Sequence, residues 1–321
     1  MKKVLVAVLT ALVLMSFFAA CTKTNPTSID VTVVVTATAT TVVFAPTATP
    51  GVWDDNYPSA DANGNIYFAS NNGLSGSGIY SVKADGTGLH KIEAGAAYRG
   101  LEVTEDGNFL FVRSNAATVK RIISSNGNPQ STYTLTSSTD IAGYGASWIS
   151  NTAKVLYNST YGAYTGLTVE DTTGSAPTNL TPGLLQNTGA ICSNPFGKYE
   201  TAGIVVYEYY DGSNWHIIKE TNASTFTDIT PGSSAKRYPA WSITALNIIY
   251  CDNTDGDYDV YVMNDNGTGK IKLFDTTANE SYPRYVPGTN KILFVSDVSG
   301  NNKLYTIDAT GNTNTIVKIS Q

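Results

Sequence analysis

The residues with the clearest chemical potential are tyrosines that recur at one place in an internal repeat, several with an arginine beside them. The tyrosines are Tyr57, Tyr98, Tyr144, Tyr238 and Tyr282, and the arginines are Arg99, Arg237 and Arg284. Tyrosine offers an apolar ring and a hydroxyl, and arginine grips carboxylates. The pattern predicts either a ring of binding residues for an acidic or C-terminal peptide, or aromatic packing between the repeats.

Conventional catalytic groups are scarce in this chain. Its two histidines, His90 and His216, fall in different repeats, on expected outer strands where an exposed imidazole is ordinary. Neither has a second ligand at the spacing of a metal site. The chain also has no Gly-x-Ser-x-Gly motif for a nucleophilic serine. We therefore expect no enzymatic activity and no cofactor.

A cluster of acidic residues in the fifth repeat resembles the start of a calcium loop. It comprises Asp252, Asp255, Asp257 and Asp259. A calcium loop needs glycine at its sixth position and glutamate at its twelfth, where this chain has Val260 and Asn266. We therefore expect no bound metal, with calcium as the alternative.

A six-fold internal repeat positions all of these residues. Its copies start at 57, 98, 144, 191, 238 and 282, between 41 and 47 residues apart. Each copy holds four short apolar or aromatic runs, such as NIIYCD from Asn247, separated by turn residues such as DNGTG from Asp265. One four-stranded antiparallel sheet per copy, repeated radially, predicts an all-β fold, a six-bladed β-propeller over 53–321. In the fourth copy, NPFGKYETAG from Asn194 stands where the other copies have a tight turn.

Two segments of the fifth copy carry a resemblance to a known family. YPAWS from Tyr238 and DVYVMNDNG from Asp259 resemble the WD-like propeller repeat of the TolB type. The resemblance extends over 53–321 and is strongest in the first, fifth and sixth copies. It implies six blades and a non-catalytic scaffold that recruits a protein or peptide. The partner-binding N-terminal domain of that family has no counterpart in 1–52, so its transport role is not implied.

The N-terminal residues are typical of an exported lipoprotein. Residues 1–20 read as a signal peptide with Lys2 and Lys3 before an apolar run, and FAAC ending at Cys21 resembles a lipobox. Residues 21–52 then form the lipidated cysteine and a Thr-, Val- and Pro-rich linker, of which 31–44 has the alternative of docking on a blade edge. An ordinary cleaved signal is the alternative to the lipoprotein.

This leader predicts a lipid-anchored protein of the bacterial cell envelope, on the outer membrane facing the periplasm or on the cell surface. In that oxidising compartment we expect Cys192 and Cys251 to be buried free thiols, with a disulfide as the alternative.

The composition limits the classes of partner. Charged residues make up only 14% of the chain, its formal net charge is −6, and no basic stripe is present, which argues against nucleic acid. We expect a monomer that binds an envelope protein or peptide. The alternative is a glycan-binding or carbohydrate-active envelope protein with its site over the central channel.

Replacing the lipidated residue tests the leader. We expect Cys21→Ser to release the protein from the membrane fraction, because the acyl chains attach at that sulfur. Fractionation and immunoblotting of wild type and variant measure this. A variant that stays in the membrane fraction would show that the leader is a plain anchor.

Overall fold

The computed structural model describes part of the chain. The described residues are 53–71, 76–95, 98, 100–113, 119–125, 128–134, 146–149, 154–161, 164–171, 178–179, 191–197, 204–221, 225–242, 247–311 and 313–320. The expected leader and linker, with Cys21 and 31–44, lie outside them, as do Arg99 and Tyr144. All described residues belong to one compact unit, 48–321.

The described residues form six antiparallel sheets of four strands each, and within every sheet the strands follow chain order. The first three sheets comprise β1 (Asp55–Ala60), β2 (Asn65–Ser70), β3 (Gly78–Lys83), β4 (His90–Ala94); β5 (Leu101–Val103), β6 (Phe109–Arg113), β7 (Val119–Ser125), β8 (Asn128–Thr134); and β9 (Ala146–Ile149), β10 (Lys154–Tyr161), β11 (Tyr164–Asp171), β12 (Thr178–Asn179). The last three comprise β13 (Ile191–Gly197), β14 (Ile204–Tyr210), β15 (Trp215–Thr221), β16 (Thr225–Asp228); β17 (Lys236–Trp241), β18 (Asn247–Asp252), β19 (Asp259–Asn264), β20 (Ile271–Phe274); and β21 (Glu280–Val286), β22 (Lys291–Ser296), β23 (Lys303–Asp308), β24 (Val317–Lys318), with the 3₁₀ turn η1 (Thr313–Thr315) before β24.

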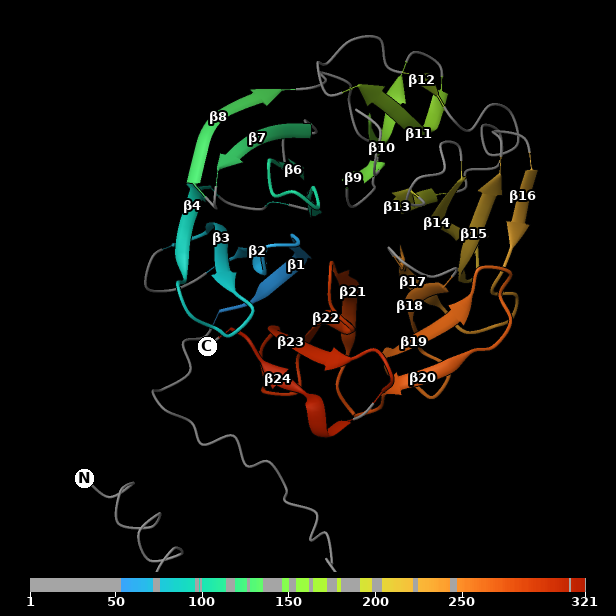
Figure 1. The fold of residues 1–321 in the computed structure, drawn as a ribbon. Helices are drawn as coiled ribbons and strands as arrows, with labels where there is room; N and C mark the ends of the chain where they lie inside the picture. The colour runs from blue at the N-terminus through green and yellow to red at the C-terminus, as the bar shows by residue number, and fades with distance from the viewer. Residues whose placement is uncertain are drawn as a thin grey trace, which may run out of the picture. The chain divides into compact units, whose positions relative to one another are not determined.

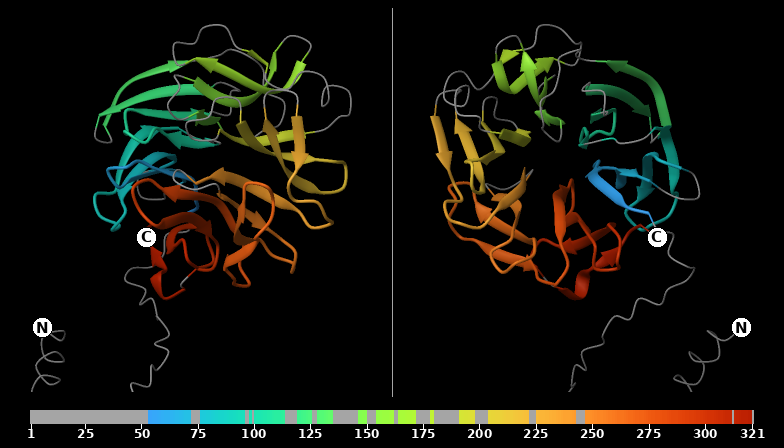
Figure 2. Two further views of the ribbon diagram at one scale, coloured as in Figure 1. Left: turned by 45° about the vertical axis from the view of Figure 1, so that its right-hand side comes forward. Right: turned by 180° about the vertical axis from the view of Figure 1, so that it is seen from behind.

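The sheets stand around a common centre, with the first strand of each sheet innermost (Figure 1). Figure 2 shows the same arrangement from two further sides. Each first strand contacts the first strand of the next sheet, and β21 of the last sheet contacts β1 of the first. The expectation of an all-β fold built from repeated antiparallel sheets is confirmed. No helix among the described residues combines the length and the apolarity needed to cross a bilayer.

The hydrophobic core lies between the sheets. Each described cluster of buried side chains draws on two adjacent sheets, as where Phe68 and Tyr80 of the first sheet meet Leu293 and Val295 of the last. Every residue of β2 is buried, because neighbouring sheets cover both of its faces. A strand covered on both faces accounts for the continuous apolar run NIYFAS. Burying such a side chain stabilises the fold by roughly 1.5–3 kcal/mol.

Tight turns of the predicted kind join the third and fourth strands. In the turn between β19 and β20, Gly267 has φ of +83° and its N–H donates to the carbonyl of Asn264 at 2.9 Å. A Cβ at this position would lie 2.3 Å from the carbonyl oxygen of Ile229, at the end of the preceding sheet. Glycine is therefore required both by the backbone conformation and by the contact between sheets.

In four sheets the pairing of the first strand with the second shifts register at a residue that precedes proline. The shifts fall at 57–58, 194–195, 238–239 and 282–283. Proline has no N–H for the ladder, so it is tolerated where a bulge interrupts the pairing. The expectation that NPFGKYETAG, from Asn194, takes the place of a tight turn is therefore wrong for its first four residues. NPFG lies in β13, and its Asn-Pro occupies the place that Tyr-Pro takes in the first, fifth and last sheets.

The first and last sheets meet without sharing a strand. Asp55 and Lys303, each only 1% exposed, form an ion pair of 3.8 Å across this seam, and the ammonium lies 4.3 Å from the ring centre of Trp53. Burial raises the pKa of Asp55 and lowers that of Lys303, and both shifts favour the neutral forms. Asn302 adds backbone hydrogen bonds, accepting from the N–H of Asp55 at 2.9 Å and donating to Asp54 Oδ1 at 3.0 Å.

Deleting the last sheet tests whether the sheets fold as one cooperative unit. We expect a chain without 282–321 to be insoluble or protease-sensitive, because the deletion opens the apolar faces of both neighbouring sheets. A chain that begins at Ala48 keeps the whole unit and serves as the control. Thermal melting and limited proteolysis report the result, and a soluble truncation with one cooperative transition would contradict the expectation.

Candidate functional site

Three of the predicted tyrosines share an unusual backbone conformation. Tyr57, Tyr238 and Tyr282 have φ values of +56°, +58° and +52°, and among the described residues no others except glycines have positive φ. Each lies at the register shift of a first strand, directly before a proline. A bulky residue in this region costs of order 1–3 kcal/mol and is found mainly at functional or tightly constrained positions.

The same three residues bring their rings together, although they come from the first, fifth and last sheets. The ring centre of Tyr282 lies 4.6 Å from that of Tyr57 and 4.2 Å from that of Tyr238. The planes are tilted by 56° and 46°, which suits aromatic attraction better than a flat sandwich. We call this group the tyrosine triad. Burial, with its two neighbouring tyrosines, raises the pKa of Tyr282 well above its usual range.

Arg237, predicted to bind a ligand carboxylate, already engages a carboxylate of the chain. Its Nη2 lies 3.0 Å from Oε2 of Glu208, a side chain of β14 that is fully buried. Oε1 of the same glutamate accepts the backbone N–H of Tyr238 at 2.6 Å. The guanidinium also lies 4.3 Å from the ring centre of Trp215. Glu208 thus fixes the start of β17, and removing Arg237 would leave a buried charge without compensation.

Arg284 is paired in a similar way, across the centre of the unit. Its Nε lies 3.5 Å from Oε2 of Glu102, so the pair joins β21 and β5, which lie on either side of β1. Burial raises the pKa of Glu102 to about 7, while Arg284 opposes the shift. The ligand-binding role of these arginines stays a prediction, but their guanidinium groups face glutamates of their own chain.

Tyr57 also lines a polar pocket beside the triad. The pocket has a volume of about 170 Å³ and lies at the start of β1, the end of β2 and the start of β3. Its polar lining includes Asp54, Asn56, Asn71 and Ser77. It is a recess with carboxylate, amide and hydroxyl groups beside an aromatic ring.

Tyr98 also lines this pocket but does not belong to the triad. It is buried in the core between the first two sheets, and its hydroxyl donates to Glu93 Oε1 at 2.8 Å. Burial and Glu93 together raise its pKa above the usual range. Gly95 makes room for the ring, because a Cβ there would lie 2.4 Å from the tyrosine hydroxyl.

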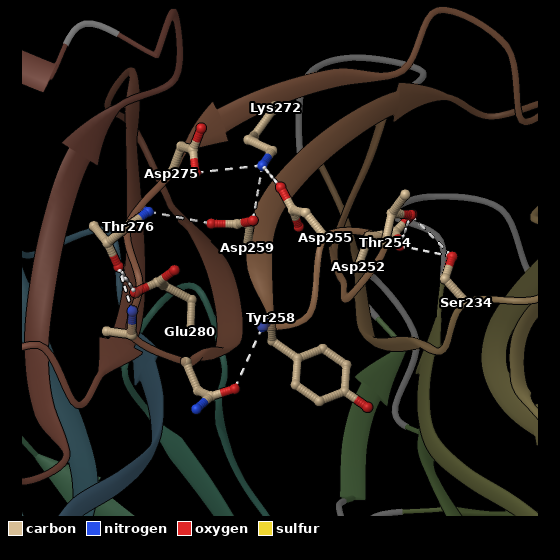
Figure 3. Close-up of polar contacts among 12 residues, drawn as sticks. Ser234, Asp252, Thr254, Asp255, Tyr258, Asp259, Lys272, Asp275, Thr276 and Glu280 are labelled. Atoms are coloured by element: carbon tan, nitrogen blue, oxygen red, sulfur yellow. Dashed lines mark hydrogen bonds and ion pairs between the residues drawn. The ribbon is translucent and has the colours of Figure 1, made fainter.

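The aspartates of the fifth sheet surround a lysine (Figure 3). Nζ of Lys272 bonds to Asp255, lies 2.9 Å from Asp259 Oδ2 and lies 3.4 Å from Asp275 Oδ1. The three carboxylates are close enough to hold a metal ion together. The ammonium takes the central position, so a cation such as calcium would have to displace it. Asp252 does not join them, since it accepts from Ser234 and Thr254.

Glu280 lies next to this cluster (Figure 3). It is fully buried, and its Oε1 accepts from Ser296 Oγ at 2.7 Å and from Thr276 Oγ1 at 3.3 Å. Burial raises its pKa to about 8, although both hydrogen bonds oppose the shift. The side chain is therefore mostly a neutral carboxylic acid at neutral pH, at the interface of the fifth and last sheets.

The histidines and the described cysteine have structural surroundings. His90 is exposed, as predicted. The prediction of an exposed imidazole is wrong for His216, which is only 7% exposed on β15 and lies 3.2 Å from Asp211 and 3.1 Å from Asp228. The third strand is covered by the neighbouring sheet, so its inward side chains are buried. Cys251 is a buried free thiol, which confirms that expectation, while the side chain of Cys192 lies outside the described residues.

Sequence reasoning missed the glutamates that hold the arginines. Glu102 in LEV and Glu208 in VVYEYY are single acidic residues within apolar runs. A charge in a strand that is otherwise buried needs a partner, and this signal marks both residues. Lys272 and Asp275 gave no comparable signal, because their place beside Asp259 depends on how β20 pairs with β19.

Comparison with known proteins supports the fold. No protein-family model and no curated protein matches the chain. TolB from Acinetobacter baumannii is similar with a TM-score of 0.63 at 14% identity, covering 78% of this chain and 63% of TolB, so the chain spans less than two thirds of that protein. The tricorn protease is similar with a TM-score of 0.61 at 16% identity, covering 85% of this chain and 26% of the protease. An oligogalacturonate lyase from Vibrio parahaemolyticus is similar with a TM-score of 0.52 at 13% identity, covering 82% of this chain and 92% of the lyase. These likenesses show a β-propeller fold.

Truncation of Tyr282, whose ring contacts both other tyrosines, tests whether the triad stabilises the fold. We expect Tyr282→Ala to lower the free energy of unfolding by about 3 kcal/mol or more, because the ring packs on both other tyrosines. Tyr282→Phe keeps the ring and is the control, with an expected loss of at most about 1.5 kcal/mol. Urea unfolding measures both. An alanine variant as stable as wild type would exclude a packing role and favour a ring reserved for ligand.

Proposed function

We propose that this chain is a non-catalytic binding scaffold of the bacterial cell envelope, which recruits a protein or peptide through a six-bladed propeller. The observation that carries the proposal is the convergence of the tyrosine triad and the polar pocket around Tyr57. The triad lies at the start of first strands, and the pocket lies at the start of β1, the end of β2 and the start of β3, so both share one edge of the sheets. An aromatic surface beside a polar recess is the kind of site that anchors a partner's side chain.

The acidic and basic groups of this region support binding more than catalysis. Catalysis by proton transfer needs an acid or base within reach of a substrate. Here Glu208 engages Arg237, and Glu280 is buried among hydroxyl donors. These groups fix the strands and their neighbours. A scaffold can keep its charged groups in such contacts and use the exposed edge for recognition.

The tether and the location belong to the same proposal. A lipidated Cys21 followed by the linker would hold the propeller at a membrane surface, on the outer membrane facing the periplasm or on the cell surface. The similarity of fold to TolB supports an envelope scaffold by analogy. A monomer is sufficient, because the sheets cover one another within a single chain.

Glycan binding is the second candidate, and the lining of the pocket favours it. Tyr57, Asn56, Asn71 and Ser77 combine a ring with amide and hydroxyl groups, which suit a sugar. Oligogalacturonate lyase has the same fold and acts on a carbohydrate, which adds an analogy at the level of fold.

Capture from the native envelope tests the scaffold. We expect the full-length lipidated protein to retain a specific protein partner after crosslinking. Asn71→Arg, on the lining of the pocket, should reduce capture at least about tenfold, because a long cationic side chain blocks the recess. Asn266→Arg is the matched control in a turn at the opposite edge of the sheets. Both asparagines use Oδ1 to accept a nearby backbone N–H, from Asp54 at 2.6 Å and from Thr268 at 3.1 Å.

Quantitative mass spectrometry of the captured material decides the result. Equal capture by the two variants would place the interaction elsewhere on the protein. Failure of the wild type to retain any protein, together with retention of an envelope polysaccharide, would reject the protein scaffold in favour of glycan binding.

A further inference from the structure

We propose that the pocket beside Tyr57 binds a cationic side chain, the ammonium of a lysine or the guanidinium of an arginine on a peptide partner. This inference rests on the proposed scaffold function and names the chemistry of its ligand. It also replaces the expectation of an acidic ligand, because Arg237 and Arg284 face glutamates of the chain itself.

The lining of the pocket has the groups that a cation needs. Asp54, Tyr57 and Tyr98 are all lining residues, so one carboxylate and two aromatic residues belong to the same recess. Among the described residues that line the pocket there is no lysine or arginine. A carboxylate beside an aromatic face attracts a cation through both its charge and the quadrupole of the ring.

The carboxylate of Asp54 is held in place before any ligand arrives. Its Oδ1 accepts the backbone N–H of Asn302 from the last sheet at 3.0 Å, and its own N–H donates to Asn71 Oδ1 at 2.6 Å. A carboxylate can accept about four hydrogen bonds, so the one that Asp54 accepts from the described residues leaves capacity for a ligand. An anchored acceptor loses little entropy on binding.

The protein already uses this arrangement for its own cations. Two side chains each lie against an aromatic ring and a carboxylate: Lys303 is 4.3 Å from the ring centre of Trp53 and 3.8 Å from Asp55, and Arg237 is 4.3 Å from that of Trp215 and 3.0 Å from Glu208. Lys91, in the same sheet, lies behind Gly78 of the lining, donates to the carbonyl of Gly76 at 3.2 Å and lies over Tyr80, and it is not among the described lining residues. The pocket brings together residues of the same two kinds, a carboxylate and aromatic rings, and its described lining residues include no cation, although Lys303 of the last sheet acts on Asp54 through its charge.

The size of the pocket favours one side chain over a whole small molecule. Its volume of about 170 Å³ lies below the roughly 300–1,000 Å³ of ordinary ligand sites. Two glycines, Gly78 and Gly95, line it and bring the backbone close to its neighbours. A Cβ at Gly78 would lie 2.2 Å from the carbonyl oxygen of Glu93, so the wall cannot move outward easily. Such a recess fits the end of a lysine or arginine that projects from a peptide.

Titration with a short peptide tests the inference on the full-length protein. The probe is acetyl-Gly-Lys-Gly-amide, and the neutral reference is acetyl-Gly-Gln-Gly-amide. We expect the lysine peptide to bind more tightly, and its affinity to fall at higher salt concentration because the interaction is partly electrostatic. Asp54→Asn keeps an oxygen for the Asn302 N–H but removes the charge, and should weaken binding about tenfold or more. Asp85→Asn, in an exposed turn at the opposite edge, is the control and should leave binding unchanged.

A second variant keeps the inference testable if Asp54→Asn is unstable. Asn56→Asp adds a carboxylate to the lining and keeps the oxygen that accepts Asn302 Nδ2 at 2.9 Å, so it should strengthen lysine binding about tenfold. Equal binding of both peptides, or equal loss in the Asp54 and Asp85 variants, would overturn the cation site. Binding of glucose or galacturonate in place of the lysine peptide would overturn it in favour of a sugar site. If wild type captures an envelope protein but the peptides do not discriminate, the scaffold stands and the cation site fails. If the lysine peptide binds more tightly than the glutamine peptide but wild type captures no envelope protein, the cation site stands and the scaffold fails.

Discussion

No sheet of this protein can bury its own two faces, and the rest of the structure depends on packing between adjacent sheets. A four-stranded antiparallel sheet is one layer thick, so its apolar side chains reach a dry environment only against a neighbour. The clusters around Phe68, Val205 and Ile249 each draw on two sheets for this reason. The same requirement accounts for the apolar runs in the second strands, such as IYFA from Ile66, where neighbouring sheets cover both faces.

Buried charged groups of the first and second strands are subject to the same requirement. Asp55, Glu102 and Glu208 lie where water is largely excluded, and each finds its cation on a different sheet. Removing a buried charge from water is costly, so the partner must be placed accurately. These pairs therefore specify how neighbouring sheets align as well as that they touch. The tyrosine triad adds an apolar contact at the centre, with strained backbone at each of its three residues.

The sequence is sufficient to predict the repeated sheets, because the signal is local. The second strands begin at Asn65, Asn247 and Lys291, where the apolar runs begin, and Gly267 lies in the turn that Asn-Gly predicts. The site was less accessible to such reasoning. The repeat predicts that a tyrosine recurs at the position of Tyr57 in other copies. The left-handed backbone of these tyrosines and the contacts between their rings depend on how three separate sheets pack. The burial of His216 and the position of Lys272 among aspartates likewise follow from tertiary pairing that no short window of sequence encodes.

The seam between the first and last sheets has a consequence for the evolution of this chain. Because β24 and β1 belong to separate sheets, the seam uses side-chain packing and short polar contacts, as the boundary between the fourth and fifth sheets does. The contacts between adjacent sheets therefore form a closed cycle, in which β21 of the last sheet contacts β1 of the first. The packing alone does not determine at which sheet the polypeptide begins. A circularly permuted gene that starts at another sheet would encode the same set of interfaces. Duplication and loss of single repeats can therefore proceed from any position, provided that the resulting sheets still meet around the centre.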